Sequence, residues 1–176
     1  MSGYSVGANP AVAHSSADRT TGGVGWGPGD TYTDANGFEW IYVQTTATPI
    51  PQFSLTRVLA SATAFPWTSA GANGTAAAGG AALIHGFAAS ASIPTSSFGW
   101  IMTKGISGVR VSATGNYIGR VWAAPSANAG FVTKASASGT LLQNCLFLDT
   151  TASTSALGTA GGTVKVAFAN LFTVLV

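Results

Sequence analysis

Short apolar segments recur along this chain roughly every eight to twelve residues, and their spacing constrains the fold more than any other feature. Gly and Ser separate the segments, while Glu, Lys and Gln, which favour helices, are scarce. Such spacing is typical of β-sandwiches and barrels. We therefore expect an all-β fold: an antiparallel β-sandwich or jelly-roll-like barrel with an extended irregular N-terminal arm.

Residues 38–44 give the clearest strand prediction. Their aromatic side chains fall on one face, and Ile41 and Val43 fall on the other. Phe98-Gly-Trp-Ile101 repeats the aromatic-x-Trp-Ile pattern of this segment, so the two could be equivalent strands. The other expected strands cover residues 54–60, 97–103, 109–112, 117–123, 130–134, 140–148 and 164–176.

The turn signal Asn36-Gly37 divides the chain into two expected parts. Residues 1–36 are rich in Gly, Ser, Thr and Asp without periodicity, which predicts the arm. Residues 37–176 form a single predicted β-sandwich domain, in which the Ala/Gly-rich stretch 69–82 is a low-complexity surface loop.

The C-terminal segment 164–176 is the most apolar of the expected strands. One of its faces carries Val and Phe side chains and is broken only by Asn170. A strand of this kind promotes aggregation if it lies at an exposed sheet edge. We therefore expect it to be central in the sheet or covered by a neighbouring subunit.

Charged residues make up only 7% of the 176 residues, whereas about a quarter is usual for a soluble protein. Hydrophobic residues make up 47%, and no apolar run reaches the length of a membrane span. The start of the chain lacks the features of a signal peptide, which predicts a protein made in the cytoplasm. The only cysteine, Cys145, lies in an apolar segment and is expected to be a buried, inert thiol. A surface this neutral suits a subunit of an assembly.

The few charges are unevenly distributed along the chain. Residues 1–39 hold four acids and one base, a net charge of −3, and residues 40–176 hold six bases and one acid, a net charge of +5. The two parts can attract each other, or each can find an opposite patch on a partner.

The chain contains no convincing catalytic or metal-binding pattern. Gly3-Tyr-Ser-Val-Gly7 has the spacing of a nucleophile elbow but lacks the strand before it and the helix after it. His14 and His85 are far apart and have no cysteine partner. The acids Asp30, Asp34 and Glu39 could bind calcium or cleave sugars, but solvated turn acids explain them better. We expect that the chain is not an enzyme and binds no cofactor. A small hydrolase is the weakest of the alternative functions.

The tryptophans raise the question of carbohydrate stacking. Trp40 is the only one beside an acid, Glu39. Trp40 and Trp100 lie in expected strands, where a core or subunit-interface position fits them better. Trp26 lies in the arm and could anchor it in a partner's pocket.

Seven short motifs follow one another along the chain from Gly37: Gly37-Phe-Glu-Trp-Ile-Tyr-Val43, Gly86-Phe-Ala-x-x-x-x-Ile93, Phe98-Gly-Trp100, Gly108-Val-Arg-Val111, Ala129-Gly130, Ala135-Ser-Ala-Ser-Gly-Thr140 and Gly161-Gly-Thr-Val164. With these motifs, residues 37–176, apart from the 69–82 insert, resemble the Ala/Gly/Ser/Thr-rich proteins that decorate, or cement, the capsids of tailed bacteriophages. The resemblance implies a β-sandwich or barrel, with no catalytic residues, on the outer capsid surface of a virion assembled in the host cytoplasm. It implies binding to the major capsid protein and a homotrimer in preference to a dimer.

No nucleic-acid or membrane partner is expected. The alternative function is a receptor- or carbohydrate-binding module of a tail fibre or spike, with a host-surface glycan as its ligand. The residues predicted to lie at a partner or oligomer interface are Trp26, Asp30, Asp34, Trp40, Trp100, Phe172, Val174 and Val176.

Overall fold

The computed structural model confirms the all-β prediction: the residues it describes form strands and turns, without a helix. Accordingly, none of these residues forms a helix that could span a membrane. The described residues are 9–15, 25–66, 82–111, 123–125, 130–134, 140–148 and 163–175. The strands are β1 (His14–Ser15), β2 (Thr31–Thr33), β3 (Glu39–Thr45), β4 (Leu55–Leu59), β5 (Thr63–Pro66), β6 (Ala82–Phe87), β7 (Ser97–Arg110), β8 (Ala123–Pro125), β9 (Val132–Lys134), β10 (Thr140–Phe147) and β11 (Thr163–Leu175).

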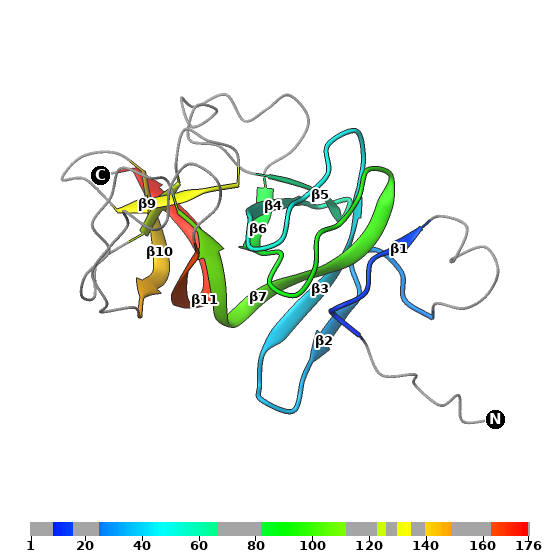
Figure 1. Cartoon of the computed structure of the whole chain (residues 1–176), viewed down its shortest axis with the longest axis horizontal. Helices are drawn as coiled ribbons and strands as arrows, with labels where there is room; N and C mark the ends of the chain where they lie inside the picture. Colours follow the sequence, from blue (N-terminus) through cyan, green and yellow to red (C-terminus); the bar gives the residue numbers. More distant parts are fainter. Residues whose placement is uncertain are drawn as a thin grey trace.

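Five strands close into a barrel in the order β3, β7, β6, β4, β5 and back to β3 (Figure 1). β3 and β5 run parallel, with Gln44 beside Thr63, while the other four pairings are antiparallel. The barrel is therefore mixed, where an antiparallel arrangement was expected. The ring closes through one β6–β7 pair, Phe87 with Met102.

β7 is a single strand of 14 residues that belongs to two parts of the sheet. Residues 98–104 pair with β3 in the barrel, and residues 104–110 pair with β11. Figure 1 shows a sharp bend between these halves, where Gly105 has a φ of 149°. The sequence predicted two strands here, over residues 97–103 and 109–112, with Gly105 and Gly108 between them. Instead, the backbone pairing continues through both glycines.

The two faces of β3 pack into different cores, as the alternation of its residues predicted. Ile41 and Val43 join an aliphatic cluster with residues of β4, β5 and β7, which fills the barrel. Trp40 and Tyr42 join a second cluster on the outer side of the barrel wall, together with Trp100. Both faces of β3 are buried, so another layer must cover the outer face.

The covering layer comes from the N-terminal part of the chain. β2 pairs with residues 39–41 of β3, and β1 pairs with the start of β7. The N–H of Gly29 donates to the carbonyl of Tyr42, and the N–H of Tyr42 donates to the carbonyl of Asp30. The described residues of this part thus follow the barrel wall, where an irregular arm was expected. Three-residue and two-residue strands are too short to produce a visible periodicity.

β11 is central in the sheet, which was one of the two arrangements expected for this apolar strand. β10 pairs with it along one edge, and β7 and β6 pair with it along the other. The expected loop 69–82 lies outside the described residues except for Ala82, which begins β6. The predicted strand 117–123 lies outside them except for Ala123, the first residue of β8.

Candidate functional site

A pocket of about 550 Å³ opens where the turn between β2 and β3 meets the bend of β7. Figure 1 shows this turn at the lower end of the barrel, near the bend. Four separate segments line the pocket, and Lys104 is the one charged residue among them. Its volume is in the range of small-molecule pockets. The lining residues are 36–38, 104–106, 144–146 and 167–169.

The pocket is hollow because of backbone shape and small side chains. A Cβ at Gly105 would stand 2.7 Å from the Sδ of Met102 and 2.9 Å from the Cγ of Phe38, so glycine is required at the bend. Across the pocket, β10 and β11 shift register next to Asn144, which has a φ of 59°. Ala167 contributes only a methyl group to the wall.

Asp34 shapes the turn that forms one wall. Its Oδ1 accepts hydrogen bonds from the backbone N–H groups of Asn36 (2.8 Å) and Phe38 (3.0 Å). Its Oδ2 accepts from the indole Nε1 of Trp40 at 3.3 Å. This pattern is an Asx turn, which places Phe38 against the pocket. The other predicted turn acid, Asp30, is exposed and accepts from the N–H of Gly27 at 2.6 Å.

The positive charge of Lys104, at the edge of the pocket, is neutralised by Glu39 of the same chain. The Nζ of Lys104 lies 2.9 Å from Oε1 of Glu39, and the two side chains are 46% and 39% exposed. The pair joins the acidic N-terminal part to the basic remainder, one of the two outcomes expected from the charge distribution. Because it is solvated, it contributes at most about 1 kcal/mol to stability.

Cys145 is one of the residues around the pocket, and its thiol is buried in the core, as predicted. Burial raises the pKa of its thiol to about 12, since the thiolate would lose its hydration. The thiol therefore stays protonated at neutral pH and behaves as a small apolar group.

An apolar row crosses the sheet beside the pocket. In register, Ile106 of β7 pairs with Ala167 of β11, and Ala167 pairs with Leu146 of β10. Ile106 is 48% exposed. Leu148, which lies two residues after Leu146, is 38% exposed. Large exposed aliphatic side chains next to a pocket are a common sign of a binding surface.

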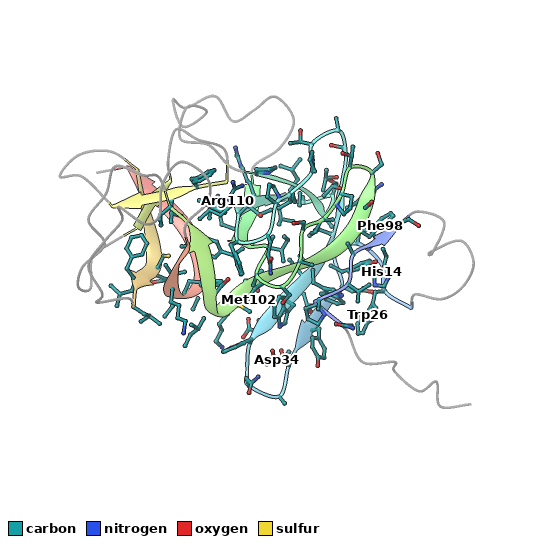
Figure 2. All side chains as sticks on the ribbon, in the orientation of Figure 1. His14, Trp26, Asp34, Phe98, Met102 and Arg110 are labelled. Carbon is teal, nitrogen blue, oxygen red and sulfur yellow. The ribbon has the colours of Figure 1, made fainter. Side chains whose placement is uncertain are left out.

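The predicted tryptophans lie away from this face, in the aromatic layer on the barrel wall. Trp40 and Trp100 are 4% and 2% exposed. Trp26 is half-buried, and its ring centroid lies 5.1 Å from that of Trp100 in an edge-on arrangement. Figure 2 shows Trp26 and His14 near Phe98, at the opposite end of β7 from Arg110. In the chain itself, Trp26 thus docks onto its own barrel.

The remaining predicted interface residues belong to the end of the chain. Phe172 and Val174 lie in β11, paired with Gln143 and Leu141, but their side chains are outside the described part. Val176 is outside it entirely. The pocket itself was missed, because four segments far apart in sequence build it and no motif marks them. Gly105 inside an otherwise continuous strand pattern was the available signal.

No family model matches the chain, and neither a curated protein nor a solved structure matches it significantly.

Proposed function

We propose that this chain is a structural virion protein that binds the outer surface of an icosahedral phage capsid and cements adjacent major-capsid-protein subunits. The capsid-decoration pattern from Gly37 to Val164 and the scarcity of charge support this role. A neutral surface can be buried against another protein with little desolvation of charged groups. When many copies bind a symmetric shell, their modest individual affinities combine into strong overall binding.

Burial of the strand tryptophans is the observation that favours the capsid role over carbohydrate binding. A carbohydrate site on this chain was expected to use Trp40 beside Glu39. The indole of Trp40 is buried and bonded to Asp34, and the carboxylate of Glu39 is paired with Lys104. The buried indole of Trp40 is therefore not available for stacking on a sugar. The glycan-binding module is therefore the less well supported function.

The partners of the proposed function are the major capsid protein and further copies of this chain, as a homotrimer or a dimer. The part of the chain that could reach a neighbouring capsomer is shorter than residues 1–36. Residues 31–33 are a strand of the sheet, and Gly29 and Asp30 are hydrogen-bonded to β3. We propose that residues preceding Asn9 contribute to binding the capsid.

Co-sedimentation with capsids tests this function. Full-length protein is mixed with capsids of the encoding phage that have been stripped of decoration, and with undisturbed capsids as the control. We expect saturable pelleting with the stripped shells only, and weaker pelleting after residues 1–8 are removed. Absence of pelleting with stripped shells would contradict the proposal, and a glycan array would then test the alternative.

A further inference from the structure

The outer face of β7, β11 and β10 carries both a projecting side chain and a hollow that could receive one. Ile106 projects from β7 with 48% of its surface exposed. The pocket beside it is lined mainly by apolar residues, with the small Ala167 among them. We infer that this face is a contact between two copies of the chain, in which Ile106 of each copy enters the pocket of the other.

The positions of projection and pocket indicate the symmetry of the contact. A ring such as a trimer joins two different surfaces of each subunit, whereas a two-fold pair joins one surface to itself. Here the projection and the pocket lie next to each other, since Ile106 itself forms part of the pocket rim. The face is therefore self-complementary, which selects a dimer over a trimer for this contact.

The charges at the rim complement a second copy. The pocket rim carries the ion pair of Lys104 and Glu39, 2.9 Å apart. Lys165, two residues before Ala167 in β11, is exposed on the same face of the sheet. In the inferred contact, Lys104 of one copy lies against Glu39 of the other, so that the four charges alternate in sign. A rim of one sign would instead repel its own copy, and a strongly charged partner of either sign gains little here.

The contact between copies is separate from binding to a shell. It is measured on the protein alone, so its failure would leave the proposed capsid role untouched. Conversely, a chain that never binds capsids could still form the pair.

Sedimentation velocity of the full chain, from micromolar to millimolar concentration, tests the inference with two complementary variants. Ile106→Ser removes the projection, and Ala167→Leu fills the pocket. A two-fold contact contains each change twice, so each variant should associate about a hundredfold more weakly than wild type. Val12→Ser is the matched control, since Val12 is 40% exposed in the N-terminal layer, and it should associate like wild type.

Mixing the two variants gives the sharpest result. The Ala167→Leu copy keeps Ile106, which fits the open pocket of the Ile106→Ser copy. The same pair contains a second contact, in which the serine at position 106 faces the pocket filled by the leucine at position 167. Because serine is small, this second contact creates no clash. We expect a heterodimer in the mixture although neither variant pairs alone. A wild type that stays monomeric at millimolar concentration would overturn the inference. So would association that both variants leave unchanged, or a mixture that fails to pair.

Discussion

Gly86 of β6 lies next to Phe87, whose pairing with Met102 of β7 closes the barrel. A Cβ there would stand 2.3 Å from the carbonyl oxygen of Met102 and 2.7 Å from Cγ2 of Ile101. Because the first of these is backbone, it cannot move aside, and Gly86→Ala should destabilise the chain by about 3 kcal/mol. Urea unfolding measures the change. Gly25→Ala, with nothing within 4 Å of the added methyl, should stay within about 0.5 kcal/mol of wild type.

Asp34 is a second residue whose effect can be isolated. Its carboxylate accepts three hydrogen bonds in the turn between β2 and β3. Asp34→Ala removes both acceptor oxygens, and with them all three hydrogen bonds, and should cost about 1–3 kcal/mol, measured by thermal unfolding. Asp30→Ala is the control, because the exposed Asp30 accepts one bond, from Gly27, and should cost less. Equal losses in the two variants would contradict the role given to Asp34.

The buried thiol of Cys145 makes stability depend on alkaline pH. Its pKa rises from 9.0 to about 12 on burial, so the unfolded chain loses this proton first. The contribution is complete below pH 9 and is lost as the pH rises toward 12, by about 1.4 kcal/mol per pH unit. Urea unfolding at a series of pH values on either side of 9.0 measures the slope. Cys145→Ala should show a shallower slope than wild type, and equal slopes would contradict burial of the thiol.

Among the elements, the N-terminal layer determines where the chain can be shortened. Removing residues 1–8 leaves every described strand in place. Removing residues 1–36 deletes β1, β2 and Trp26, and uncovers the aromatic face of Tyr42 and Trp100. We expect the first truncation to unfold cooperatively near the wild-type temperature. The second should aggregate or lose its near-ultraviolet circular dichroism, and a well-folded product would contradict the covering role.

Strands with clear alternation were predictable from the sequence, and elements fixed by tertiary contacts were not. The two faces of β3 and the apolar β11 followed from side-chain periodicity, and both are found. The repeated aromatic-x-Trp-Ile segments prove to be directly paired strands, with Ile41 beside Ile101. β5 has only four residues and pairs in parallel with β3, which no local pattern encodes. The pocket was equally inaccessible, because it depends on the bend at Gly105 and on the register shift beside Asn144.

At the scale of the whole molecule, a small closed barrel carries a surface with few charges. Closure leaves the barrel strands without free edges, which limits uncontrolled pairing with other chains. In the described part, the face of β7, β11 and β10 exposes Ile106 and Leu148, and the ion pair of Lys104 and Glu39 lies beside it. Such a molecule is suited to fixed contacts with other protein subunits, which is the role proposed for it on a capsid.

The release of packaged DNA on heating tests the cementing role most directly. Capsids stripped of decoration are heated with and without saturating amounts of this protein, and DNA exposure is followed with an intercalating dye. The proposed function predicts that the bound protein raises the temperature of release, because each copy bridges capsid subunits that must separate. An unchanged release temperature, with the protein demonstrably bound, would contradict cementing and leave only a decorative attachment.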